Sequence, residues 1–197
     1  MYRFSRLNLY SRFNNADDRE GKRMPVLNSD RIYIIGFMGS GKSTLGRRLA
    51  KVLGYNFIDT DQIIEEQVGM SISELFRQAG EKSFREMETR ILRETTLSGK
   101  AVIATGGGMP CSDEHILLIN THGISIYLEA NSAFLKQRLL QGKRQRPLMA
   151  GVTEDEMEGK IKKLLNDREP FYKQAHYTIP LPVESVETLI KSIGLGG

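Results

Sequence analysis

The chain has 197 residues, enough to bury a hydrophobic core without disulfides or a structural metal. Cys111 is the only cysteine, so an intrachain disulfide is excluded and a reducing, cytoplasmic location is expected. Glycines or charges interrupt every apolar stretch before the roughly 18 residues of a membrane span, and the net charge of +4 forms no basic, aromatic-rich face for nucleic acid. We expect a monomer that acts on small molecules.

The first 30 residues have neither helical nor strand periodicity. The first 23 carry six basic and three acidic residues, which account for most of the net charge of the chain. Their acid-free start is compatible with a transit peptide, but Asp17 and Asp18 soon follow and no apolar signal core is present. We therefore predict a flexible N-terminal extension over residues 1–30 and a single domain over residues 31–197.

The first predicted strand, residues 32–35, runs directly into the stretch GFMGSGKST. Gly36, Gly41, Lys42 and Ser43 have the spacing G-x-x-x-x-G-K-[ST], and they lie between a predicted strand and a predicted helix, as this phosphate-binding motif requires. Glycines let backbone N–H groups converge on an anion, the lysine adds a cation, and the serine hydroxyl is a magnesium ligand. The alternative is a glycine turn that only joins strand to helix, but such a turn has no use for Gly-Lys-Ser.

Short β-rich runs and helical patterns alternate along the rest of the chain, which predicts a parallel sheet covered by helices on both faces. The predicted strands are residues 32–35, 56–59, 101–104, 124–128 and 177–179. The predicted helices are residues 43–53, 62–68, 71–79, 83–97, 113–121, 132–141, 154–172 and 185–193. Ligands of such folds bind beyond the carboxyl ends of the strands, where this chain has its phosphate motif, DTD and TGGG.

Two carboxylates follow the second predicted strand. Asp59 and Asp61 are two residues apart, and in an extended segment such residues point the same way. One carboxylate would then reach magnesium, directly or through water, and the other would reach an acceptor hydroxyl. The alternative is a strand-end turn in which Asp61 caps the following helix.

The remaining strand ends discriminate between classes of phosphate-loop protein. The Asn-Lys-x-Asp guanine reader of GTPases and the Leu-Ser-Gly-Gly-Gln motif of transport ATPases are both absent from the sequence. The third predicted strand ends in TGGG, where many of these ATPases carry a metal-binding aspartate. This pattern favours a small-molecule kinase.

From about residue 31 to residue 193 the chain resembles the shikimate kinases. The shared motifs are GFMGSGKSTLGRRLA, FIDTD, FREME, TGGG, RPL at 146–148 and REPFY at 168–172. The resemblance implies a nucleoside-monophosphate-kinase-like P-loop fold, an α/β architecture with a five-stranded parallel sheet and a closing lid at about residues 142–153. It also implies transfer of the γ-phosphoryl of ATP to the 3-hydroxyl of shikimate, a step toward chorismate and aromatic amino acids.

The same resemblance implies roles for individual residues. Asp59 would lie near Mg²⁺ through water, with Ser43 as a direct ligand. Asp61 would grip the shikimate hydroxyls and orient or deprotonate the attacking one, and Arg146 would reach the phosphates from the lid. The shikimate site would be completed by Arg85, Gly107 and Arg168. The ATP phosphates would be bound by Gly39, Ser40, Gly41, Lys42, Ser43 and Thr44, and the catalytic residues would be Asp61, Lys42 and Arg146.

The residues themselves suit this assignment. Shikimate has one carboxylate and three hydroxyls, and the planar donors of arginine match a carboxylate in pairs. Each arginine also has a simpler interpretation as a surface ion pair: Arg85 with Glu88 one helical turn later, and Arg168 with Glu169 or Asp167. The glycine triplet could likewise be only a loop. Arg138 is the candidate for adenine stacking, although its spacing from Arg146 departs from the family pattern.

Two other functions fit part of the sequence. Another small-molecule kinase, such as a gluconate kinase, shares the phosphate motif and the fold, but the arginine set and TGGG argue against it. A noncatalytic nucleotide-binding module is disfavoured because Asp59, Asp61, Lys42 and Arg146 occur together.

Overall fold

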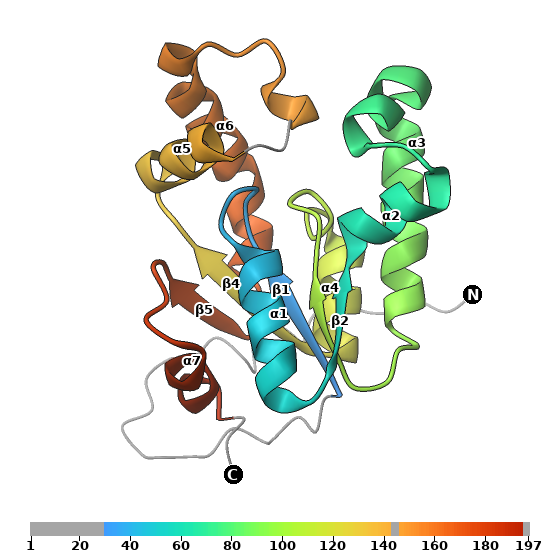
Figure 1. Ribbon diagram of the computed structural model, residues 1–197, viewed down its shortest axis with the longest axis vertical. Helices are drawn as coiled ribbons and strands as arrows, with labels where there is room; N and C mark the ends of the chain where they lie inside the picture. The colour runs from blue at the N-terminus through green and yellow to red at the C-terminus, as the bar shows by residue number, and fades with distance from the viewer. Residues whose placement is uncertain (1–29, 143–145, 195–197) are drawn as a thin grey trace, which may run out of the picture.

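The computed structural model describes residues 30–142 and 146–194, so most of the predicted N-terminal extension and residues 143–145 near the start of the predicted lid lie outside the described residues. Within those residues the strands form one parallel sheet in the order β2-β3-β1-β4-β5 (Figure 1). The strands are β1 (Arg31–Ile35), β2 (Asn56–Asp59), β3 (Ala101–Ala104), β4 (Ile124–Glu129) and β5 (Tyr177–Pro180). The predicted five-stranded sheet is confirmed, and every strand lies within one residue of its predicted bounds.

The two central strands are buried along nearly their whole length. Residues 32–35 of β1 and 101–104 of β3 are almost inaccessible to solvent, which matches their continuous apolar runs and a sheet covered on both faces. Ile34 is in register with Ala104 on one side and Ile126 on the other. The carboxyl ends of β1, β2 and β3 therefore meet at one edge of the sheet.

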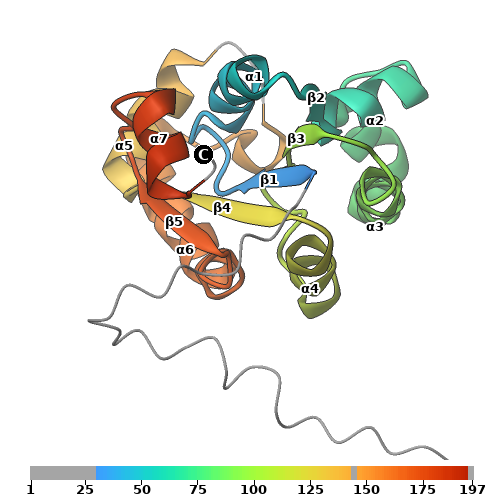
Figure 2. The same ribbon diagram turned by 90° about the horizontal axis from the view of Figure 1, so that it is seen from below.

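Helices cover both faces of this sheet, as Figure 2 shows. On one face, α1 (Lys42–Leu53) and α7 (Val186–Ser192) pack their apolar residues against Ile34 and Ile126. On the other face, α4 (Asp113–His122) and α6 (Glu154–Tyr172) pack against Tyr33 and Tyr127. Because successive residues of a strand point to opposite faces, β1 contributes to both clusters.

The remaining helices flank the site, and two of them also contribute Leu92 and Leu135 to the core cluster that contains Tyr33 and Tyr127. They are α2 (Thr60–Val68), α3 (Ile72–Thr95) and α5 (Ser132–Gln141). We predicted two helices over residues 71–79 and 83–97, and the structure joins them into α3 across a kink at Gly80, where φ is 79° and ψ is 172°. Glycine permits this non-helical conformation without a side-chain clash, so the chain continues as a helix on both sides of it.

The described part of the predicted lid contains a short 3₁₀ helix, η2 (Pro147–Met149), that the sequence did not predict. Leu148 and Met149 pack against the core cluster under α6, and η2 lies opposite α3. Among the described residues, the helices are all too short or too polar to cross a membrane.

Candidate active site

A cavity of about 280 Å³ opens beyond the carboxyl ends of β1, β2 and β3. In Figure 1 the phosphate loop and the glycine-rich loop after β3 rise into this region, with α2 and α3 on one side and α5 and α6 on the other. The predicted acceptor residues Asp61, Arg85, Gly107 and Arg168 all line the cavity, and so does Arg146 from the lid. Five segments that are distant in sequence are therefore brought to one place.

The phosphate loop is held partly by its own lysine. Lys42 is 9% exposed, and its Nζ donates hydrogen bonds of 2.9 Å to the carbonyl oxygens of Gly36 and Phe37. Burial lowers the pKa of this ammonium to about 8, and nearby Asp61 opposes the shift. Helix α1 begins at Lys42 after Gly41, whose φ is 94°, so the positive end of the helix faces the loop.

The other loop residues lie in the same turn. Ser40 is buried, whereas Ser43 is half-buried and Thr44 is exposed on the first turn of α1. A Cβ at Gly39 would come within 3.2 Å of Leu139, and one at Gly41 within 3.5 Å of Arg138 Nη2. The last turn of α5 therefore covers the phosphate loop, and Arg138 stands beside the loop.

Asp59 joins the phosphate loop to α2. The Ser43 hydroxyl donates a 2.6 Å hydrogen bond to Asp59 Oδ2, while Oδ1 accepts from the amides of Asp61 and Gln62 as the N-cap of α2. Ser43 and Asp59 thus present two adjacent oxygen ligands, the type that Mg²⁺ prefers. The described residues contain no cluster of three or more His, Cys, Asp or Glu side chains suited to a metal.

The geometry predicted for the two aspartates is wrong. Asp61 does not continue an extended segment, because α2 begins at Thr60 and places Asp61 in its first turn. The alternative, in which Asp61 caps this helix, is also wrong, since Asp59 is the cap. The two carboxylates consequently serve different neighbours: Asp59 contacts Ser43, and Asp61 Oδ2 lies 4.0 Å from Arg146 Nη1.

Asp61 and Glu88 approach each other beside the glycine loop. A Cβ at Gly106 would lie 2.7 Å from Asp61 Oδ1 and 2.8 Å from Glu88 Oε1, so a side chain at this position would displace both carboxyl groups. Glu88 is 1% exposed, and burial raises the pKa of its carboxyl to about 7 against the opposing effect of Arg85. The cavity wall therefore carries Asp61 and, buried next to it, the Glu88 carboxyl with its raised pKa.

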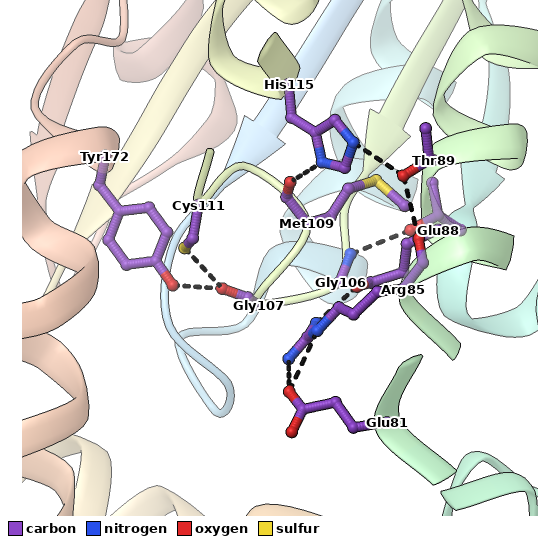
Figure 3. Close-up of polar contacts among 11 residues, drawn as sticks. Glu81, Arg85, Glu88, Thr89, Gly106, Gly107, Met109, Cys111, His115 and Tyr172 are labelled. Carbon is purple, nitrogen blue, oxygen red and sulfur yellow. Dashed lines mark hydrogen bonds and ion pairs between the residues drawn. The ribbon is translucent and has the colours of Figure 1, made fainter. Parts of the chain in front are cut away.

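Arg85 has both of the interactions that the sequence left open. Its Nη1 is 2.5 Å from Glu88 Oε2 and its Nη2 is 2.8 Å from Glu81 Oε1, so the predicted ion pair with Glu88 exists (Figure 3). The same guanidinium also packs on the glycine loop and lines the cavity, because a Cβ at Gly108 would fall 2.4 Å from Nη1. The two carboxylates hold Arg85 at the cavity wall.

Arg168 does not form the surface ion pair that was its alternative. It is 7% exposed, and within the described residues its Nη1 has no hydrogen-bond partner. Glu169 instead pairs with Lys173 at 3.2 Å. The guanidinium lies 5.5 Å from the centre of the Phe37 ring, and a Cβ at Gly107 would lie 3.6 Å from Nη1. A buried cation with an unsatisfied donor is therefore directed at the glycine loop and the cavity, as expected of an anion site.

The apolar part of the cavity was not predicted from the sequence. Phe84 and Glu88 line the cavity and belong to the FREME motif, from which only Arg85 was predicted as a site residue, so that motif contained the signal. Phe76 comes from the segment before the Gly80 kink, and its ring lies 4.8 Å from that of Phe84. The further lining residues are Met38, Glu65, Ser71, Ile72, Ser73, Gly108, Pro147 and Leu148.

Comparisons with known proteins agree with this arrangement. The family model for shikimate kinases matches residues 38–193. The chain belongs to the shikimate kinase family. A shikimate kinase of Bacteroides fragilis is 42% identical over 147 residues, which are 75% of this chain and 82% of the relative.

Solved structures give the same family. The crystal structure of a shikimate kinase from Bacteroides thetaiotaomicron has a TM-score of 0.78 and 37% identity over 83% of this chain and 98% of its own. A shikimate kinase from Acinetobacter baumannii, solved in complex with shikimate, has a TM-score of 0.75 and 37% identity over 83% and 89% of the two chains. The predicted family, its P-loop kinase fold and its ATP-dependent kinase activity are thereby confirmed, and the two alternative functions are set aside.

Proposed function

We propose that the cavity holds shikimate and that the phosphate loop presents ATP, so that the γ-phosphoryl group passes to the 3-hydroxyl of shikimate. The observation that carries this assignment is Arg168, a buried guanidinium whose Nη1 has no partner among the described residues and which faces a cavity lined by Asp61. A ligand with both a carboxylate and hydroxyls satisfies the cation and the acidic group together.

On the acceptor side, Arg168 and Arg85 bind the carboxylate, and Gly107 lets the ligand approach the backbone. Asp61 accepts hydrogen bonds from the ring hydroxyls and orients or deprotonates the one that attacks. Its distance of 4.0 Å from Arg146 supports this role, because it places the acceptor carboxylate next to the arginine that would meet the phosphates.

On the nucleotide side, the backbone and side chains of residues 39–44 bind the phosphates, and Lys42 adds a positive charge. Phosphoryl transfer needs little covalent help from the protein, so alignment and charge stabilisation dominate. Lys42 and Arg146 supply that charge from the loop and from the lid. Arg146 directly precedes η2, whose Pro147 and Leu148 line the cavity, and this position supports a lid that excludes water from the reaction.

Ser43 and Asp59 are the residues that would hold Mg²⁺, Asp59 through water. Their oxygens lie 2.6 Å apart at the start of α1, and this pair fits a cation that prefers oxygen ligands and retains several waters. When bound, the ion neutralises charge on the phosphates. The monomeric state and the cytoplasmic location stay predictions from the sequence.

A coupled assay with ATP, magnesium and either shikimate or gluconate tests this proposal. We expect ADP release that depends on shikimate and a product phosphorylated at the 3-position by ³¹P NMR. The variant Lys42→Met should lose this activity. Turnover of gluconate at the rate of shikimate, or a phosphate at another hydroxyl, would contradict the assignment of the acceptor.

A further inference from the structure

The glycine loop after β3 is braced from behind by a histidine that does not line the cavity. We propose that His115 is a positioning residue for the acceptor site: it holds Met109 and Thr89 at a fixed separation, and thereby fixes the spacing between the glycine loop and Arg85. This inference rests on the proposed function, because it concerns binding of the acceptor at that site.

His115 bridges two parts of the chain through both ring nitrogens. Its Nδ1 is 2.7 Å from the carbonyl oxygen of Met109, and its Nε2 is 2.9 Å from the Thr89 hydroxyl (Figure 3). A carbonyl oxygen only accepts hydrogen bonds, so Nδ1 carries a proton and donates it. The ring therefore joins the loop to α3 with two directional contacts.

Each end of the bridge lies next to a residue of the cavity wall. Met109 directly follows Gly108, and Thr89 is one helical turn after Arg85. The Thr89 hydroxyl lies within hydrogen-bond distance of His115 Nε2 and, at 3.0 Å, of the Arg85 carbonyl, and its single hydrogen can be donated to one of these acceptors at a time. The Arg85 guanidinium packs on Gly108, where a Cβ would come within 2.4 Å of it. His115 thus closes a ring of contacts that runs through Gly108, Met109, Thr89 and Arg85.

The brace is anchored in rigid structure. The His115 amide donates to the hydroxyl of Ser112, the N-cap of α4, and Met109 is fully buried in the core. On the other side of the loop, the Tyr172 hydroxyl donates to the Gly107 carbonyl, and Cys111 Sγ lies 3.7 Å from the same oxygen. The Gly107 carbonyl and the Gly108 N–H belong to the same trans peptide bond and point in opposite directions. Because the carbonyl points toward Tyr172, the Gly108 N–H points away from it.

The packing between Arg85 and the loop explains why the brace matters for binding. The guanidinium is fixed by Glu81 and Glu88 on its own helix, and none of those contacts sets the distance from α3 to the glycine loop. The His115 bridge does set it. A site that must hold a small ligand between an arginine and a backbone wall loses affinity when the two drift apart.

Two substitutions remove the bridge from opposite ends. His115→Asn keeps an N–H donor near Met109 but does not reach Thr89, whereas Thr89→Val removes the hydroxyl and preserves the shape of the side chain. We expect each to raise the KM for shikimate roughly three- to tenfold, the worth of one hydrogen bond, with the KM for ATP unchanged. The double variant should resemble either single variant, because both remove one contact. Thr89→Ser should behave as wild type.

His122→Asn is the matched control, because His122 lies on the same helix and its Nδ1 contacts the Leu118 carbonyl at 2.9 Å, far from the cavity. It should leave the shikimate KM unchanged. If wild-type enzyme fails to phosphorylate shikimate, the proposed function is wrong. If wild type is active but His115→Asn and Thr89→Val each change the KM for shikimate by less than about twofold, the positioning role is wrong. It is also wrong if the increase in KM in the double variant equals the product of the two single increases. Thr89→Val against Thr89→Ser decides the question should His115→Asn not fold.

Discussion

The phosphate loop and the acceptor cavity share one edge of the sheet but are assembled differently. The loop is a continuous strand, turn and helix, and its buried cation, Lys42, bonds to two carbonyls within six residues of itself. The cavity draws its walls from α2, α3, the glycine loop, the lid and α6. Its buried cation, Arg168, has an Nη1 donor without a partner in the described part of the chain.

This difference separates two kinds of binding site. A site made from one segment can satisfy its own charge and fold as a unit. A site made from distant segments can keep a charge unsatisfied, because the rest of the fold holds it in place at the cost of stability. If the two parts behave independently, a mutation in one should leave ligand binding by the other unchanged.

The largest effect is expected from Asp61→Asn. This change removes the acidic group that serves the acceptor hydroxyl, so turnover should fall at least about 10²-fold. Binding of a nonhydrolysable ATP analogue, measured by calorimetry, should stay near that of wild type. A large loss of nucleotide affinity would show that Asp61 also serves the phosphate loop. Activity within a few-fold of wild type would show that Asp61 is not needed for the acceptor hydroxyl.

Arg168→Met should raise the KM for shikimate roughly 10- to 100-fold, the range expected for hydrogen bonds to a charged group. The KM for ATP should not change. Because the variant removes a buried charge whose Nη1 lacks a partner, its melting temperature should equal or exceed that of wild type. A lower melting temperature with an unchanged shikimate KM would make Arg168 a structural residue instead.

Glu88 should make stability depend on pH. Burial raises the pKa of its carboxyl to about 7, so the folded protein keeps a proton that the unfolded chain releases at lower pH. Stability from this group is therefore present below its unfolded pKa and is lost as pH rises through about 7. Relative to wild type, Glu88→Gln should gain on the order of 1–3 kcal/mol of unfolding free energy from pH 5 to pH 8.

Denaturant unfolding at several pH values measures this trend. Glu81→Gln is the control, since Glu81 contacts the same Arg85 from an exposed position. A pH-independent difference between Glu88→Gln and wild type would refute the prediction.

The smallest effect is expected from deleting residues 1–24. The family match begins at residue 38, and these residues contain none of the motifs of either part of the site. Turnover and both Michaelis constants should stay within about twofold of wild type, as for many terminal segments outside a domain. If truncation lowers the affinity for shikimate, residues 1–24 contribute to the acceptor cavity and the prediction is wrong.

Sequence patterns predicted the locally encoded features well. The phosphate loop has a fixed spacing, and the strands are buried apolar runs between glycines and polar turns, so both were predicted to within about one residue. The Asp59 and Asp61 geometry was predicted wrongly because α2 starts directly at the end of the strand. The two-residue alternation of side-chain directions in a strand does not show where the next helix begins.

The contacts between distant segments could not be predicted. Phe76 and Phe84 are apolar residues of a helix, and periodicity cannot tell a core position from a cavity wall. Whether Arg168 pairs with a neighbour or is buried depends on how α6 packs against the phosphate loop. The contacts of His115 with Met109 and Thr89 span a helix and a loop, and they exist only after the fold has formed.

The internal bonds of Lys42 have a consequence for the energetics of nucleotide binding. Two of the three N–H donors of the Lys42 ammonium are used by the Gly36 and Phe37 carbonyls, and the negative charge of a phosphate group beside it will favour the protonated form. With a pKa of about 8 before binding, Lys42 is partly neutral at pH 8, so nucleotide binding there takes up a fraction of a proton from the buffer. The heat of binding at pH 8 should then vary with the ionisation enthalpy of the buffer, and the contribution of Lys42 to this variation should disappear near pH 6.5.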